Sequence, residues 1–310
     1  MILATVLLLG GAVLVAAGAA GAVRSAGRLA TSLGLPLFVL GAMVFGIDLE
    51  GLGAALVASG RGETGLATGT ALGTVLFVGG FAFGAALLVA PAPVPSPGTV
   101  MAITPALPLA GAGMALYDGV VGRLEGGMLV AIYAGYLAVV VSEGRAIRAA
   151  STGRSEAEAG DTTSRTRALG ATAASLACLW AGAWLLVQGG VRVLEGSGLR
   201  AGFVGVAVLA TLAGLDEILL EVVPVRRGQP HLATGNLFGT VAAFPSAVLG
   251  LAALVHPLAS DGPADLALIA GTALYAVTAA VFLLRGRAGR ILGGLLVAAY
   301  VAWLAGTWSL

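Results

Sequence analysis

The sequence predicts an all-α, polytopic membrane protein of ten transmembrane helices, arranged as two inverted repeats of five helices. Three observations support this fold class: a composition with few charges, ten apolar stretches long enough to cross a bilayer, and an internal duplication. Ionisable residues inside membrane helices are rare and are usually functional. The charged residues that lie within the apolar stretches are therefore the first candidates for a functional site.

The composition excludes a water-soluble fold. Of 310 residues, 58% are hydrophobic and 10% are charged, and the mean hydropathy is +1.01, whereas soluble domains carry about 25% charged residues. A chain with so few charges could not cover a water-exposed surface, so its main partner is expected to be the lipid bilayer. The formal net charge of +1 gives no sign of binding to nucleic acid.

Ten apolar stretches approach the length of about 20 residues that a spanning helix needs. The first lacks the basic start of a cleaved signal peptide, so it is expected to remain as a membrane helix. The second and seventh are long, are interrupted by glycines and contain acidic residues. In chain order, the ten predicted helices are residues 2–23, 31–60, 64–90, 99–117, 124–143, 168–195, 199–226, 230–255, 265–285 and 289–309.

A polar segment, residues 143–167, divides the chain into a first repeat (1–142) and a second repeat (168–310). Its composition is typical of a solvated linker. Twelve arginines follow odd-numbered helices, with Arg24 and Arg28 counted in the loop after the first, and four follow even-numbered ones. The positive-inside rule then places the linker in the cytoplasm and both termini outside.

Two pairs of segments repeat along the chain. The segment "GETGLATGTALGT" (62–74) matches "GQPHLATGNLFGT" (228–240) at an offset of 166 residues, and "GVVGRLEGGMLVAIY" (119–133) matches "GRAGRILGGLLVAAY" (286–300) at an offset of 167. These matches indicate internal duplication. Because five helices is an odd number, the second repeat must enter from the opposite side of the membrane. Inverted repeats are typical of alternating-access transporters, whose sites lie near the bilayer midplane on discontinuous helices.

Acidic residues precede both copies of the matching hairpin. In the second copy, Asp216 and Glu217 follow a glycine-interrupted turn, and Glu221 lies one helical turn further on. In the first copy, Asp48 and Glu50 occupy a similar place. A broken helix frees backbone carbonyls, which, like carboxylates, are good ligands for hard cations. Pairing of the two halves is expected to bring these acids together near the bilayer centre.

An ionised carboxylate at the bilayer centre costs about 2.5–3.5 kcal/mol on insertion scales, and protonation or a bound cation removes that cost. The alternative is that Glu221, Asp48 or Glu217 reaches the membrane interface with its side chain. Neutral oxygen ligands could come from the polar residues of the hairpins, which are Thr70, Thr74, Asn236 and Thr240. Each of these four could instead serve as a helix-packing contact.

Motifs of the common enzyme classes are not found in the sequence, which contains no P-loop, nucleophile elbow or HExxH motif. We therefore expect no enzymatic activity and no organic cofactor. The single cysteine, Cys178, excludes an intrachain disulfide and a cysteine-based metal cluster. The oligomeric state is not indicated by the sequence.

At this level the chain resembles the cation/Ca²⁺ exchanger superfamily, in its prokaryotic sodium/calcium exchanger branch. The two alpha-repeats of that family read roughly "GTSLPEL…RG.PDLALGN..GSNIFN", and residues 212–244 read "LAGLDEILLEVVPVRRGQPHLATGNLFGTVAAF". Glu217 falls on the ion-binding Glu of the family, eleven residues before Gly228, and Asn236 and Thr240 fall on the "N" and "S" of "GN..GS". The "DGRISRLEG..L..LY" segment of the family is similar to "DGVVGRLEGGMLVAIY" (118–133).

The chain also departs from the family pattern. In the first repeat, the position of the ion-binding Glu is Gly51, with Glu50 one residue away and Asp48 at the Ser position. The Asn of "GN" is Thr70. The final polar positions of the two repeats are Val78 and Phe244. In the second repeat, the residue before Glu217 is Asp216 where the family has Pro.

The resemblance implies a secondary cation antiporter in a prokaryotic cell membrane, with Ca²⁺ and/or Na⁺ bound by Glu217, Asp216, Asp48 and Glu50. Exchange of Na⁺ for H⁺, or of other monovalent cations, is an alternative, because the neutral ligands are fewer and neighbouring carboxylates disfavour one another's ionisation. A membrane scaffold that no longer transports is a second alternative. The apolar Val78 and Phe244 favour the scaffold, and the four acids argue against it.

Overall fold

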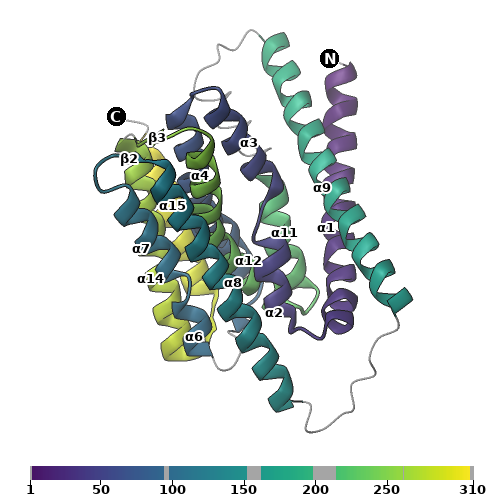
Figure 1. Ribbon diagram of the computed structural model, residues 1–310. Coiled ribbons are helices and arrows are strands. Elements are labelled where there is room, and N and C mark those ends of the chain that lie inside the picture. Colours follow the sequence, from purple (N-terminus) through teal and green to yellow (C-terminus); the bar gives the residue numbers. More distant parts are fainter. Residues whose placement is uncertain (1, 94–97, 152–161, 198–213, 261, 308–310) are drawn as a thin grey trace.

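The computed structural model describes residues 2–93, 98–151, 162–197, 214–260 and 262–307, which form a bundle of helices (Figure 1). The first half contains α1 (Ile2–Leu33), α2 (Leu37–Leu40), the π-helical η1 (Gly41–Phe45), α3 (Leu49–Gly60), α4 (Thr64–Leu76), the π-helical η2 (Phe77–Ala82), α5 (Phe83–Val89), α6 (Gly98–Ile103), α7 (Ala106–Ala115) and α8 (Arg123–Ser151). The second half contains α9 (Thr162–Ser197), α11 (Leu215–Arg226), α12 (Pro230–Ala243), the π-helical η4 (Phe244–Val248), α13 (Leu249–Val255), α14 (Gly262–Arg285) and α15 (Arg290–Thr307). Four two-residue strands complete the described elements: β1 (Ala92–Pro93), β2 (Val120–Val121), β3 (Leu258–Ala259) and β4 (Arg287–Ala288).

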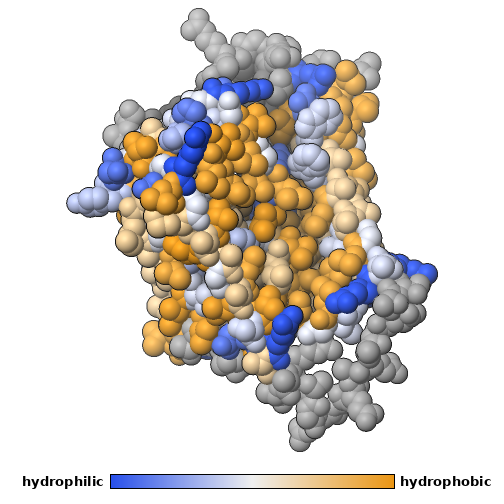
Figure 2. All heavy atoms as spheres, viewed as in Figure 1, coloured by the Kyte–Doolittle hydropathy of each residue, from blue (hydrophilic) through white to orange (hydrophobic). Residues whose placement is uncertain are grey.

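Seven helical segments among the described residues are long and apolar enough to cross a membrane. They are Leu3–Leu33, Leu37–Gly60, Thr64–Val89, Arg123–Ile147, Arg165–Gly190, Pro230–Val255 and Asp265–Arg285. Two shorter apolar helices, Val100–Ala115 and Arg290–Gly306, accompany them. Hydrophobic residues cover the middle of the visible face, and hydrophilic residues lie mainly toward its two ends (Figure 2). The protein is therefore a multi-pass helical membrane protein.

The predicted helix positions agree with the structure most closely in the two matching hairpins, where the predicted helix 230–255 coincides with α12, η4 and α13. The predicted end of the first helix at residue 23 is wrong, because α1 continues to Leu33. Arg24 and Arg28 therefore lie within this helix, and their exposed side chains are compatible with it. The chain turns only at Gly34, whose φ of 70° suits glycine, and Pro36 then precedes α2.

Helices occupy both ends of the segment predicted as a linker. α8 runs to Ser151 and α9 begins at Thr162, and residues 152–161 between them lie outside the described part. In Figure 1 the beginning of α1 and the end of α15 lie toward one end of the bundle, and the end of α8 and the beginning of α9 lie toward the other.

α1 and α9 form a pair that stands at one side of the bundle (Figure 1). Glycines line their interface, so that a Cβ added at Gly11 or Gly182 would lie within 3 Å of backbone atoms of the facing helix. Small residues allow membrane helices to approach closely and to pack without a hydrophobic driving force. The pair packs against α11 and α2 through apolar clusters that are separate from the main core.

The main core joins the two halves of the chain. Phe238 of α12 packs edge-on against Phe38 of α2, with ring centroids 5.5 Å apart, and against Phe282 of α14 at 5.8 Å. The short strands also pair crosswise: β1 pairs with β4 and β2 pairs with β3, each antiparallel. Each half therefore contributes one strand to both small sheets.

The closest crossing between the halves lies beside the two interrupted helices. Gly235 and Gly239 of α12 face Gly41 and Gly46 at the two ends of η1, and a Cβ added at Gly235 or Gly239 would overlap the backbone of the facing segment. A glycine pair spaced by four residues is a common device for close helix contact in membranes. This crossing brings the polar residues of α12 next to the break that precedes α3.

Candidate cation site

The first interrupted helix supplies Asp48. The helical path through α2 and η1 ends at Phe45, and α3 begins at Leu49, with Asp48 as its N-cap. The Asp48 carboxylate accepts hydrogen bonds from the backbone N–H of Glu50 (2.8 Å) and of Gly51 (2.6 Å). This capping explains why the chain tolerates an acid here, and the carboxylate retains lone pairs for a further ligand.

The second interrupted helix supplies Asp216 and Glu217. α11 begins at Leu215 after Gly214, so both acids lie in its first turn. They are 4% and 5% exposed, respectively. The N-terminal end of a helix carries a partial positive charge that favours acidic side chains. The residues that precede α11, including Gly205 of the predicted interruption, lie outside the described part of the chain.

The fold brings these acids from the two halves together. One carboxylate oxygen each from Asp48, Asp216 and Glu217 lies within 4.8 Å of the others, a spacing at which the three could hold one metal ion. Glu50 is close enough to act electrostatically on Asp216. The described charged groups that act on Asp216 and Glu217 are all acidic, so a cation is the missing charge that would stabilise the group.

Unpartnered oxygens are concentrated in the same two hairpins. Within the described residues, six buried oxygens here make no hydrogen bond: Glu50 Oε2, Asp216 Oδ1, Glu217 Oε2, Glu221 Oε2, Asn236 Oδ1 and Thr240 Oγ1. Leaving a buried polar atom without a partner costs about 1–3 kcal/mol. A hard cation prefers several oxygen ligands and would satisfy several of these atoms at once.

The four predicted neutral ligands divide by hairpin. In α12, Asn236 and Thr240 are 1% and 0% exposed, and Asn236 Nδ2 donates to Glu221 Oε1 at 3.0 Å. In α4, Thr70 donates to the carbonyl of Leu66 (2.8 Å) and Thr74 to that of Thr70 (2.9 Å). Hydrogen bonds of this kind, to a carbonyl one turn earlier, are local to a helix. Among the described residues, neither α4 hydroxyl bonds a carboxylate.

Glu221 is the residue that the sequence interpretation undervalued. Its side chain is 0% exposed, so the alternative that it reaches the membrane interface is wrong. It lies four residues after Glu217 on the same face of α11. The signal available in the sequence was this spacing, together with a polar partner, Asn236, in the following helix. Asp48 is half-buried and held by its cap.

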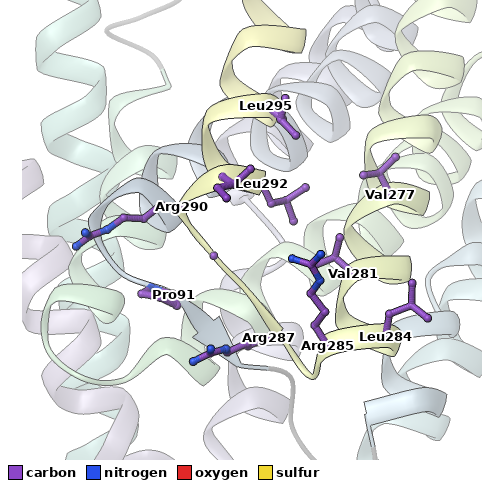
Figure 3. A pocket seen from close by; sticks show the side chains of 11 residues that line it. Pro91, Val277, Val281, Leu284, Arg285, Arg287, Arg290, Leu292 and Leu295 are labelled. Carbon is purple, nitrogen blue, oxygen red and sulfur yellow. The ribbon is translucent and has the colours of Figure 1, made fainter.

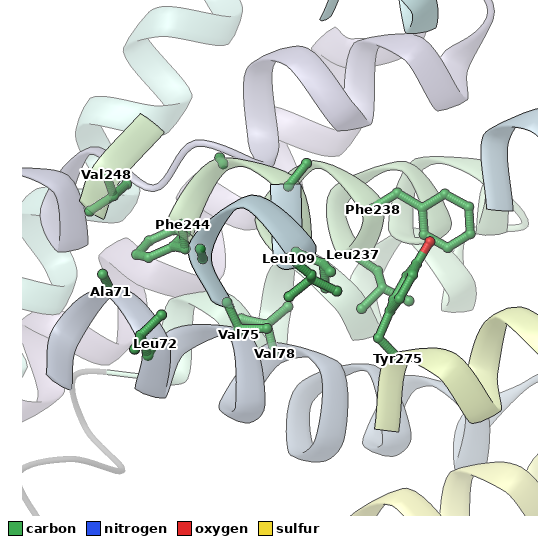
Figure 4. Close-up of a cluster of buried hydrophobic side chains, with 14 of the residues drawn as sticks. Ala71, Leu72, Val75, Val78, Leu109, Leu237, Phe238, Phe244, Val248 and Tyr275 are labelled. Carbon is green, nitrogen blue, oxygen red and sulfur yellow. The ribbon is translucent and has the colours of Figure 1, made fainter. Parts of the chain in front are cut away.

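The two family positions that are apolar in this chain belong to the hydrophobic core. Val78 and Phe244 are both 0% exposed, and both lie in the main apolar cluster. Figure 4 shows Phe244 beside Ala71 and Val248, and Val78 next to Val75 on the adjacent helix. The polar ligands therefore do not extend to these two positions.

An open hollow elsewhere on the molecule has a different chemistry. It lies between α14 and α15 (Figure 3), is about 720 Å³ in volume, and is lined by aliphatic side chains together with Arg285, Arg287 and Arg290. Three arginines would repel a cation, and no carboxylate is among its lining residues. The candidate cation site is the buried acidic cluster.

Buried carboxylates from two interrupted helices, facing one another in a multi-pass membrane protein, are features of a cation-transport protein. The sodium/calcium exchanger protein family matches residues 3–142 and 167–308, and the chain belongs to that family. The family comprises cation antiporters, so cations and a membrane setting follow from membership.

Two relatives and a solved structure extend this comparison. The chain is 29% identical to the inner membrane protein YrbG of Escherichia coli (strain K12), over 98% of this chain and 97% of that protein. It is 30% identical to the putative antiporter CaxA of Alkalimonas amylolytica, over 37% of this chain and 36% of that protein. Its fold matches the sodium-calcium exchanger NCX_Mj soaked with Na⁺ and Sr²⁺, with a TM-score of 0.86, 22% identity and coverage of 98% of each chain. At that identity the structural likeness concerns the fold.

Proposed function

We propose that the protein is a secondary active antiporter of the sodium/calcium exchanger type, which exchanges Na⁺ and Ca²⁺ through a carboxylate site at the membrane midplane. The observation that carries the proposal is the convergence of Asp48, Asp216 and Glu217 from two halves of the chain. Glu50 adds charge at the rim of the cluster. Asn236 and Thr240 supply neutral oxygens from α12, and the roles of Thr70 and Thr74 are secondary.

Alternating access would result from movement of the α1–α9 pair against the rest of the bundle. This pair packs through its own apolar clusters and contacts α11, which bears two of the acids. The two halves act as inverted repeats in this mechanism. The crosswise strand pairing and the equal offsets of the hairpin glycines Gly62 and Gly228, both with positive φ, support that arrangement.

Flux measurements in proteoliposomes test this function. The purified protein is reconstituted with Na⁺ inside, and uptake of labelled Ca²⁺ is followed after dilution into Na⁺-free buffer. Uptake that depends on the Na⁺ gradient is expected. Gradients of K⁺ and of H⁺ in place of Na⁺ separate the monovalent and proton-coupled alternatives. A protein that moves none of these ions, while remaining folded, would be a scaffold.

Orientation is tested separately by labelling. We propose that both termini lie outside and that residues 143–167 lie in the cytoplasm of a prokaryotic cell. In a Cys178→Ala background, a Ser155→Cys variant should resist a membrane-impermeant thiol reagent in intact cells and react after lysis. Labelling in intact cells would reverse the proposed orientation.

A further inference from the structure

Glu221 is an acid in a position where packing alone would favour an apolar residue. Its side chain is fully buried in α11. At the offset of 166 residues that relates the two hairpins, the matching position of the first half is Ala55, which is equally buried and apolar. Replacement of buried ionic groups by apolar residues is often neutral or stabilising, so a fully buried Glu requires an explanation other than packing.

The hydrogen bonds of Glu221 are only partly satisfied. Oε1 accepts from Asn236 Nδ2 at 3.0 Å, whereas Oε2 has no partner in the described structure, and neither has Asn236 Oδ1. Because the Asn236 amide faces Glu221, its unpartnered oxygen and the free carboxylate oxygen belong to one small group. Two buried acceptors without donors are the arrangement that a cation satisfies.

This group is separate from the three-carboxylate cluster. Four helical residues separate Glu221 from Glu217, which is about 6 Å along the axis of α11. Glu221 is not among the three acids whose oxygens converge within 4.8 Å. It interacts electrostatically with Glu217, so a cation at one position would be felt at the other.

The opposite side of the cluster is closed by an aromatic ring. A Cβ added at Gly51 would lie 2.9 Å from Cε1 and Cζ of Phe244, and 2.7 Å from Asp48 Oδ2. The ring therefore occupies the space that a longer side chain at position 51 would need. The first half cannot place an additional carboxylate there, and the additional acid of this chain lies on α11 instead.

We infer that Glu221 and Asn236 form a second cation subsite, which takes a monovalent cation such as Na⁺ while the cluster of Asp48, Asp216 and Glu217 takes a divalent one. The inference rests on the proposed exchange function. A single buried carboxylate balances a single positive charge, and amide and carboxylate oxygens are suitable ligands for a hard cation. Three convergent carboxylates match a divalent ion better.

Equilibrium binding of labelled Na⁺ and of labelled Ca²⁺ to the purified full chain in detergent tests the assignment without requiring transport. Glu221→Gln keeps the acceptor for Asn236 and removes the charge. It should raise the Kd for Na⁺ by at least about tenfold and change the Kd for Ca²⁺ much less. Glu217→Gln should show the reverse preference, and Glu63→Gln, at an exposed position, should match the wild type.

Folding is controlled by size-exclusion chromatography and by the melting temperature without added cation, and Glu221→Asp, which keeps the charge, should retain part of the Na⁺ affinity. Unchanged Na⁺ binding by folded Glu221→Gln, or an equal loss of both cations, would overturn the second subsite while leaving the proposed exchange intact. Failure of the wild type to bind either cation would overturn the proposed function and this inference together.

Discussion

The two matching hairpins share a sequence pattern but contribute unequally to the site. The second, α11 with α12, carries Asp216, Glu217, Glu221, Asn236 and Thr240, and all five side chains are buried. At the same offset of 166 residues, the first carries Glu50, Gly51, Ala55, Thr70 and Thr74. Only Glu50 preserves a carboxylate, and Asp48 adds one from the preceding turn. The duplication has therefore kept the backbone and concentrated the ligands in one half.

Burial accounts for this inequality. From Leu232 to Ala243 every residue of α12 is buried, because the helix crosses η1 at its glycines and packs in the centre of the bundle. α4 is less enclosed: Leu66 is 60% exposed and Thr70 is half-buried. A ligand gains electrostatic strength where water is excluded. Polar residues are therefore worth more in α12 than at the matching positions of α4.

Neutralising the acid of the second hairpin should have the largest effect. Glu217→Gln preserves shape and removes the charge that a cation needs, so we expect Na⁺-dependent Ca²⁺ uptake to fall by at least about 100-fold, as for loss of a paired charge in a buried site. The measurement is flux in proteoliposomes at matched protein content. Glu63→Gln, at the exposed start of α4, is the control and should transport normally. Equal flux in both variants would remove Glu217 from the site.

The amide of Asn236 and the matching hydroxyl of Thr70 give the second comparison. Asn236→Ala should lower the unfolding free energy by about 1–3 kcal/mol, because the buried Glu221 loses its hydrogen-bond donor. Thr70→Ala removes a bond to a carbonyl one turn earlier and should change stability by less than about 0.5 kcal/mol. Thermal unfolding in detergent measures both. Similar losses in the two variants would mean that the halves contribute equally.

Gly51 and Gly53 of α3 sharpen the comparison within the first hairpin. Gly51→Ala places a Cβ against the Phe244 ring and the Asp48 carboxylate, and should destabilise the protein by about 1–3 kcal/mol, as for overpacking. Gly53→Ala meets no described atom within 4 Å and should be stabilising by about 0.5–1 kcal/mol, as for Gly→Ala in a helix. Phe244→Leu should recover part of the loss in Gly51→Ala. A Gly51→Ala variant as stable as Gly53→Ala would show that the ring moves freely.

The sequence was sufficient for features that depend on local pattern. The hairpin 230–255, the break before α3 and the pairing of Asp48 with Asp216 and Glu217 follow from apolar length, glycine position and duplication. Other features depend on contacts between distant segments. The burial of Glu221 requires the approach of α12, and the seat of Phe244 against Gly51 requires both halves in place. The length of α1 was missed because exposed arginines in a helix and in a loop read alike.

The hydroxyls of Thr240 and Thr74 should show the smallest difference, and its sign is informative. Thr240 Oγ1 is fully buried and unpartnered, so Thr240→Val, which keeps the shape, should leave the ion-free protein equally stable or stabilise it by about 1 kcal/mol. If the hydroxyl is a ligand, the same variant should weaken Ca²⁺ binding by about threefold to tenfold, the effect of one neutral oxygen. Thr74→Val removes a hydrogen bond to the Thr70 carbonyl and should alter neither quantity appreciably. Melting temperatures and Ca²⁺ titrations of the two variants separate these contributions. A Thr240→Val protein that is less stable without ions and unchanged in affinity would assign the hydroxyl to packing, and the ligand set of α12 would then end at Asn236.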